Sequence, residues 1–304
     1  MGEMDLNALN ARFSAKGQVR FRKGPGGLVM LDIGNSLAMA RMMLQGAHVT
    51  AWMPRGERPV IWLSRDAKFA PGKSIRGGVP ICWPWFGAHP KESTFPAHGF
   101  ARTVPWEVLD ARAMPNGSTS LALRLVPSDD TRKQWPHATE VELYINVGKS
   151  LAMELSTRNQ GSEPVQIGQA LHTYFGVSDV RDIVLHGLGG CAYLDKLEGF
   201  ARKQQSGPVT INGETDRIYL DSTVDCMIDD PRWKRRIRVA KSGSRSTVVW
   251  NPWVEKSKQM GDLGHDGYVN MLCVESANAA DDVVTLAPGG THTLRVRYSV
   301  EPLS

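Results

Sequence analysis

The sequence lacks the features that mark membrane, secreted and metal-binding proteins. Its four cysteines lie far apart and form no C-x-x-C pair, so neither a disulfide framework nor metal-ligand spacing is present. No apolar run approaches the ~20 residues that span a membrane, and the N-terminal residues include acidic ones without the apolar segment of a secretory signal. These absences predict a cytoplasmic protein without a membrane partner or a bound metal.

Helical periodicity and internal repeats are also scarce. No apolar stripe with the ~3.6-residue period of a helix is long enough for a helical layer, and no repeat is found. The one fair helix candidate is 253–260, and 129–135 fits a short helical turn. Residues 1–18 form a polar lead-in, for which a short helix and a loose segment both remain open.

The charge balance is mildly basic. The formal net charge is +5 and the isoelectric point is about 9.0, which permits an anionic partner without requiring one. The basic residues are spread along the chain, and the densest run, 232–238, lies in no recognisable nucleic-acid module. We therefore expect no nucleic-acid partner.

Short β-prone runs separated by turn residues dominate the chain after the lead-in. So many strands without intervening helices predict an all-β protein, one large antiparallel β-sandwich that spans 1–304 as a single domain. The candidate strands are 18–22, 28–33, 37–44, 48–53, 60–63, 106–110, 120–126, 139–147, 151–158, 165–177, 183–185, 217–220, 224–228, 235–240, 246–250, 270–275, 283–286 and 291–300.

One stretch, Ser74–Arg102, departs from this rhythm. Arg76 and Arg102 bracket a glycine pair, prolines that alternate with aromatics, and His98. Glycine lets the backbone approach a ligand closely, and proline fixes φ and excludes a regular helix or central strand. The stretch is therefore a stiff, irregular loop, which serves either to bind a ligand or to plug one end of the sandwich with its arginines solvated.

The same stretch resembles a known family. SIRGGVPICWPWFG followed by HGFAR is similar to the signature of the hexose-6-phosphate mutarotases, the glucose-6-phosphate 1-epimerase branch of the aldose 1-epimerase family. The resemblance implies a galactose-mutarotase-like β-sandwich. Further matches follow in the family's order: GQALHTYF (Gly168–Phe175), GETDRIY (Gly213–Tyr219), STVVWNPW (Ser246–Trp253), CVESAN (Cys273–Asn278) and LAPGGTHTL (Leu286–Leu294).

Two residues in these motifs are candidates for acid-base chemistry. Strand alternation places His172 on one face with Ala170 and Tyr174, and Glu275 ends a strongly apolar run. From the residues alone, a structural histidine and an edge or ion-paired carboxylate remain open. The resemblance implies that His172 and Glu275 are the catalytic pair. Interconverting sugar anomers needs an acid at the ring oxygen and a base at the anomeric hydroxyl, and no metal or other cofactor.

The remaining candidates concern the substrate. The resemblance implies that His98 and Asp216 contact the sugar, although Asp216 also fits a turn residue. A guanidinium grips phosphate through two hydrogen bonds. The sequences around Arg76 and Arg102 (R-G-G and H-G-F-A-R) resemble the phosphosugar branch of the family, which implies a hexose 6-phosphate, with glucose 6-phosphate first. We expect a monomer or a weak homo-oligomer with this small-molecule partner. A mutarotase for a free aldose and a non-catalytic carbohydrate-binding sandwich are the alternatives. A glycosidase is disfavoured because it needs paired carboxylates.

Overall fold

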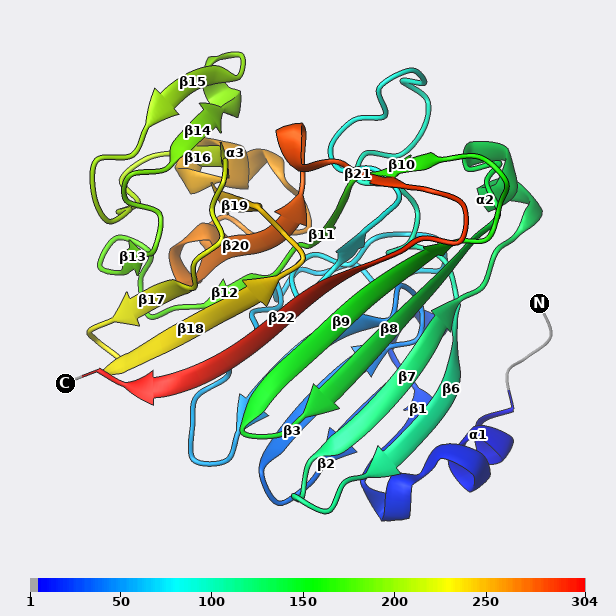
Figure 1. Ribbon diagram of the computed structural model, residues 1–304. Helices are drawn as coiled ribbons and strands as arrows, with labels where there is room; N and C mark the ends of the chain where they lie inside the picture. Colours follow the sequence, from blue (N-terminus) through cyan, green and yellow to red (C-terminus); the bar gives the residue numbers. More distant parts are fainter. Residues whose placement is uncertain (1–4, 304) are drawn as a thin grey trace.

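The computed structural model describes residues 5–303 and consists mainly of antiparallel strands (Figure 1). A four-stranded sheet is formed by the first part of the chain, in the order β1-β2-β3-β4. An eight-stranded sheet, called here the long sheet, has the order β13-β17-β18-β22-β9-β8-β7-β6. The bounds are β1 (Val19–Lys23), β2 (Val29–Gly34), β3 (Ala38–Met43), β4 (His48–Pro54), β6 (Trp106–Ala113), β7 (Thr119–Leu125), β8 (Thr139–Val147), β9 (Ser150–Asn159), β13 (Val184–His186), β17 (Cys226–Asp230), β18 (Arg235–Ser242) and β22 (Thr291–Pro302).

A second eight-stranded sheet, called here the irregular sheet, has the order β15-β14-β16-β19-β20-β11-β5, with β12 also paired to β20. β10 and β21 form a separate two-stranded sheet. The bounds are β5 (Ile81–Cys82), β10 (Val165–Ile167), β11 (Gln169–Leu171), β12 (Tyr174–Gly176), β14 (Ala192–Asp195), β15 (Ala201–Gln204), β16 (Thr215–Tyr219), β19 (Ser246–Asn251), β20 (Met271–Asn278) and β21 (Val284–Leu286).

Helices are few and short. They are α1 (Leu6–Phe13), α2 (Asp129–Gln134) and α3 (Trp253–Gln259), with 3₁₀ turns η1 (Ala15–Gly17), η2 (Pro25–Gly27), η3 (Lys196–Glu198), η4 (Gly267–Asn270) and η5 (Ala280–Asp282). Within residues 5–303, no helix has the length and apolar character needed to cross a membrane. The predicted all-β class is confirmed.

The main core lies between the long sheet and the two sheets that face it. In Figure 1 the blue strands β1–β3 lie behind the green strands of the long sheet. One continuous apolar cluster includes Trp52 from β4, Leu143 from β8, and Leu272 from β20, all of them fully buried. Because the long sheet is covered on one face only, its strands alternate: every second residue of β9 from Leu151 to Asn159 is buried. In β20 all eight residues are buried.

Within the lead-in, α1 forms the helix that was one of the two states left open by the sequence, and residues 1–4 lie outside the described residues. The Asn10 side chain in α1 donates to the Phe21 carbonyl at 2.9 Å and accepts from the Phe21 amide at 2.8 Å. The Asn10 amide therefore replaces a neighbouring strand at the open edge of β1, and α1 covers an edge that would otherwise be free to pair with another chain.

Several strand predictions were wrong in their bounds. The run 165–177 is divided among β10, β11 and β12. Residues 60–63 form only isolated bridges, such as Leu63 to Gly77. Strands β5, β14 and β15 were not predicted. These differences all lie in or beside the irregular sheet, where pairing partners rather than local pattern determine the backbone.

Candidate active site

The first half of the Ser74–Arg102 loop runs alongside residues 62–64. Gly77 has φ of 100°, and a Cβ there would lie 2.7 Å from the Cα of Leu63. Only glycine permits this approach. The Ser64 amide donates to the Arg76 carbonyl at 3.2 Å, so the backbone that carries Arg76 is held on the irregular sheet's edge.

The second half of the loop folds back on its own start. Gly99 has φ of 69°, and a Cβ there would lie 2.0 Å from the Trp83 carbonyl oxygen. The amide of Phe100 donates to that carbonyl at 3.1 Å. This closure brings His98 and Arg102 to the same side of the molecule as Arg76.

His172 lies at the bend between β11 and β12, where its amide donates to the Pro80 carbonyl at 3.0 Å. The neighbouring Thr173 side chain faces the long sheet and hydrogen-bonds the Tyr298 hydroxyl at 2.5 Å. His172 and Tyr174 face the opposite way, as strand alternation predicts. Their rings stack with centroids 5.1 Å apart and planes 16° from parallel, which fixes the imidazole plane.

Glu275 meets His172 from the neighbouring strand β20. Nε2 of His172 lies 3.1 Å from Oε1 of Glu275, and the two side chains are 11% and 1% exposed. Nδ1 of His172 and Oε2 of Glu275 are buried and have no hydrogen-bond partner within residues 5–303. Both side chains are buried, the carboxylate more completely, and the imidazole is the carboxylate's only protein partner among the described residues.

Burial shifts the pKa of both groups toward the neutral form. The pKa of Glu275 is raised well above its usual 4.5 by burial and by the charge of Asp216, which outweigh Lys196 and Arg102. The pKa of His172 is lowered well below 6.5 by burial, and next by His98 and Arg102. Both shifts favour a state in which the two groups hold a single proton between them, on the carboxyl group.

His98 lies against this pair as a neutral hydrogen-bond donor. Its Nδ1 accepts from the Gly87 amide at 3.3 Å, so in the neutral ring the proton sits on Nε2. Burial, and then the charges of Arg102, Lys196 and Arg76, lower its pKa to about 3. Its ring centroid is 5.7 Å from that of His172.

Three cations surround the pair. Nε of Arg76 donates to Asp262 at 3.1 Å and Nη1 donates to the Tyr174 hydroxyl at 3.1 Å, which leaves Nη2 free. Burial opposes the charge of Arg76, but Tyr174 and Asp262 outweigh it and raise the pKa. Arg102 donates to the Ala97 carbonyl at 2.8 Å and has no carboxylate partner in the described chain.

The third cation, Lys196, was not predicted. It lies in η3, in the turn of the β14–β15 hairpin, and its ammonium group is 2.8 Å from Oδ2 of Asp216 on β16. Asp216 is only 8% exposed, so the lysine compensates a carboxylate that would otherwise be buried with an unpaired charge.

All six residues singled out from the sequence line one cavity of about 250 Å³. They are His172, Glu275, Arg76, His98, Arg102 and Asp216; Lys196, Tyr174, Phe86 and Trp250 also line it. Asp262 pairs with Arg76 and Asp216 pairs with Lys196, so with Glu275 neutral the charge of Arg102 is left in excess. The cavity therefore favours an anionic ligand that also offers hydroxyl groups.

His172, Cys273 and Glu275 also place ligand atoms within 4.8 Å of one another. Burial raises the pKa of the Cys273 thiol well above its usual range. A metal ion at these atoms would have to displace the thiol proton and the proton shared by His172 and Glu275.

The chain is similar to several known proteins. The family model described as aldose 1-epimerase matches residues 29–299. A protein of Escherichia coli (strain K12) named "Putative glucose-6-phosphate 1-epimerase" is 36% identical over 84% of each chain. The crystal structure of a "putative mutarotase (YeaD)" from Salmonella typhimurium is 31% identical, with a TM-score of 0.89 over 98% of this chain and 100% of that one.

A more distant structure extends the likeness in fold. A galactose mutarotase-like protein from Lactobacillus casei is 14% identical, with a TM-score of 0.70 over 90% of this chain and 100% of that one. This likeness concerns the fold alone, and it bears out the predicted galactose-mutarotase-like sandwich. Because the family model covers most of the sequence, the chain belongs to the aldose 1-epimerase family of isomerases.

Proposed function

We propose that the protein interconverts the α and β anomers of a hexose 6-phosphate, with glucose 6-phosphate preferred. The observation that carries this proposal is the contact of 3.1 Å between His172 Nε2 and Glu275 Oε1, in a cavity that also holds Arg76 and Arg102. The pair offers an acid and a base, and the arginines offer donors to a phosphate. The name of the E. coli relative supports the same substrate.

The mechanism follows from the single proton that the pair holds. In one tautomer His172 is protonated and Glu275 is a carboxylate. His172 donates its proton to the ring oxygen, Glu275 accepts the proton of the C1 hydroxyl, and the C1–O5 bond breaks to give the open-chain aldehyde. The proton of the pair is now on Glu275, in the tautomer that burial favours.

Closure reverses these transfers. After rotation about C1–C2, the C5 hydroxyl attacks the other face of the aldehyde, His172 takes the hydroxyl proton, and Glu275 returns its proton to the aldehyde oxygen. The pair carries one proton throughout, so no net charge enters or leaves the buried site. A low-polarity environment therefore does not oppose the reaction.

Binding of the sugar uses the remaining wall of the cavity. The Nε2–H of His98 can donate to a sugar hydroxyl, the carboxylate of Asp216 can accept from one, and Trp250 and Phe86 add apolar surface to the cavity. Arg102 has no carboxylate partner in the described chain, so its guanidinium can pair with the phosphate. Arg76 keeps Nη2 free for the same purpose, with its other nitrogens held by Asp262 and Tyr174.

The decisive experiment measures anomer exchange directly. NMR exchange rates between the α and β signals of glucose 6-phosphate should rise with added protein, while those of glucose and galactose rise little. Comparable acceleration of free glucose would favour a free-aldose mutarotase. Binding without acceleration of any sugar would make the protein a carbohydrate-binding sandwich. A His172→Asn variant is the control: it should not raise the exchange rate, unless groups outside the proposed site catalyse the exchange.

A further inference from the structure

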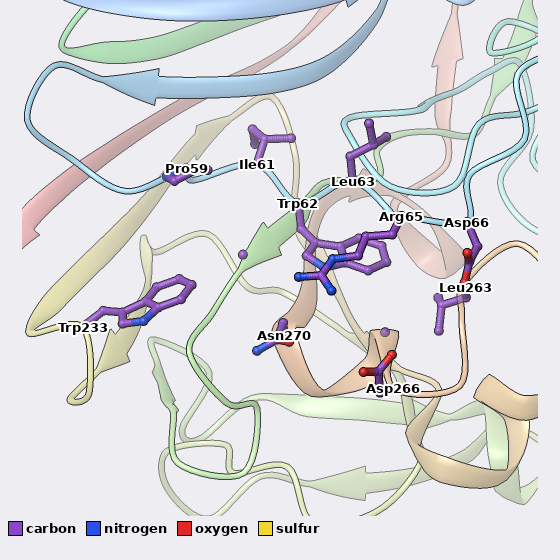
Figure 2. A pocket seen from close by; sticks show the side chains of 12 residues that line it. Pro59, Ile61, Trp62, Leu63, Arg65, Asp66, Trp233, Leu263, Asp266 and Asn270 are labelled. Atoms are coloured by element: carbon purple, nitrogen blue, oxygen red, sulfur yellow. The ribbon is translucent and has the colours of Figure 1, made fainter. Parts of the chain in front are cut away.

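A second cavity, of about 540 Å³, has Trp62 in its wall (Figure 2). Its polar and aromatic wall is formed by Trp62, Arg65, Asp66, Trp233, Asp266 and Asn270. Trp62 stacks on Tyr174, with ring centroids 5.8 Å apart and planes at 17°, and Tyr174 in turn stacks on His172. The two cavities thus share one aromatic column but no lining residue.

The side chains of this wall have hydrogen-bonding capacity that the described protein does not use. Arg65, Asp66 and Asp266 take part in no ion pair within residues 5–303. Asn270 donates its amide to the Ser178 carbonyl at 2.7 Å, so its own oxygen is left as an acceptor. Figure 2 shows the Arg65 guanidinium beside the Trp62 ring, with Asn270 and Asp266 on the opposite wall.

A buried side chain, Arg235, holds residues of this cavity in position. Arg235, only 3% exposed, donates to the Pro59 carbonyl at 3.2 Å and to the Gly176 carbonyl at 2.6 Å, and both of those residues line the cavity. The same guanidinium lies 4.7 Å from the Trp233 ring centroid. A buried cation therefore fixes the backbone of one wall and the indole of the other.

The charges around this cavity balance, unlike those of the active site. Arg65 and the buried Arg235 contribute two positive charges, and Asp66 and Asp266 contribute two negative charges. No excess positive charge is available for a phosphate, so a neutral ligand suits this cavity better. A hydroxyl both donates and accepts, so a polyhydroxyl ring satisfies carboxylate, guanidinium and amide groups together while an indole covers its apolar face.

We propose that this cavity is a second sugar-binding site, which takes a neutral pyranose or glycoside rather than a sugar phosphate. Trp62 and Trp233 provide the aromatic surfaces, and Asp66, Asp266 and the Asn270 oxygen accept from ring hydroxyls. The proposal depends on the geometry of this cavity and not on the reaction proposed for the other one.

The test uses methyl β-D-glucopyranoside, which has no anomeric hydroxyl and cannot be turned over. Saturation-transfer NMR and calorimetry should detect binding to the full-length protein. An Asp66→Ala/Asp266→Ala variant should bind at least about tenfold more weakly, the effect of losing hydrogen bonds to charged groups. The matched control, Asp129→Ala/Asp130→Ala, removes two exposed carboxylates from α2 and should bind as the wild type does.

A Trp62→Ala variant removes one of the two aromatic surfaces and should also lose binding of the glycoside. Adenosine serves as a neutral aromatic competitor and should not bind more tightly than the glycoside. The proposal is overturned if the glycoside does not bind at millimolar concentrations, if the double aspartate variant binds it unchanged, or if adenosine is preferred. Each result is independent of whether glucose 6-phosphate is a substrate.

Discussion

The long sheet and the irregular sheet differ in the length of their strands and in the polar residues that they bury. In the long sheet, β8, β9 and β22 pair over nine residues at a time, with buried apolar residues on one face and ion pairs such as Arg295–Glu154 on the other. In the irregular sheet the strands are shorter, and β20 buries Glu275, Ser276 and Asn278 beside its apolar residues.

This difference shows where the molecule accepts a cost in stability. A buried carboxylate whose pKa is raised is a destabilising feature, because its ionised form is not adequately solvated. The long sheet contains no comparable catalytic candidate among its described residues. We therefore expect substitutions in the irregular sheet to alter activity more than stability, and substitutions in the long sheet to do the reverse.

The largest effect is expected for Glu275→Gln. The amide keeps the shape of the carboxyl but cannot carry the shuttled proton, so kcat should fall by about 10²–10⁴-fold. The raised pKa of Glu275 means that ionisation opposes folding as pH rises above 4.5, and glutamine removes this penalty. Thermal unfolding at pH 7 should therefore occur at the same or a higher temperature.

The control for this variant is glucose 6-phosphate binding, which should persist when measured by calorimetry. A folded Glu275→Gln protein with near-normal turnover would contradict both the assignment and the division between the sheets. His172→Asn should lose a similar factor. Because both residues act in one step, the double variant should lose less than the product of the two single losses.

Leu155→Ala tests the other sheet. Leu155 is fully buried in β9 and pairs with Leu294 of β22 and Leu143 of β8. Removing its side chain leaves a cavity in the main core and should lower the free energy of unfolding by about 2–5 kcal/mol, measured by urea denaturation. Turnover per folded molecule at 25 °C should stay near the wild-type value. A large loss of kcat without loss of stability would break the comparison.

Arg102→Ala should have a smaller and more selective effect. With the phosphate contact removed, kcat/KM for glucose 6-phosphate should fall by about 10- to 150-fold, the equivalent of 1.5–3 kcal/mol. Any activity on free glucose should hardly change. Arg102→Lys should restore only part of the loss, because a point charge cannot form the two parallel hydrogen bonds of a guanidinium. Equal losses for both sugars would show that Arg102 supports the loop rather than the phosphate.

The sequence predicts the long sheet better than the irregular one for the same physical reason. A strand covered on one face must alternate, so 139–147, 151–158 and 291–300 were recognised within one or two residues at most ends. β15 (Ala201–Gln204) has no apolar alternation, and it exists because it pairs with β14, which pairs in turn with β16. Pairing of this kind is set by tertiary structure and leaves no local pattern.

The absence of a local pattern also explains which site residues the sequence predicts and which it misses. His172, Glu275, Arg76, His98, Arg102 and Asp216 lie in motifs that resemble a family, and the structure brings them into one cavity. Lys196 lies in no such motif, and only the β14–β15 hairpin carries it to Asp216. The one signal for this lysine in the sequence was Asp216, because a carboxylate buried in the predicted site needs a cation nearby.

The last prediction concerns the pH dependence of kcat/KM and has the smallest expected effect, a change of about tenfold per pH unit. In the proposed mechanism the pair is active with one proton, so activity should be lost when His172 accepts a second proton and when Glu275 releases the last one. The lowered pKa of His172 places the acid limb below 6.5, and the raised pKa of Glu275 places the alkaline limb well above 4.5. Between the limbs, kcat/KM should be flat, and beyond each limb it should fall about tenfold per pH unit. Circular dichroism of the sheets should stay constant across both limbs, and activity should return on readjustment to pH 7. A single limb centred on 6.5 would mean that His172 titrates as an exposed imidazole, which the contact with Glu275 does not allow.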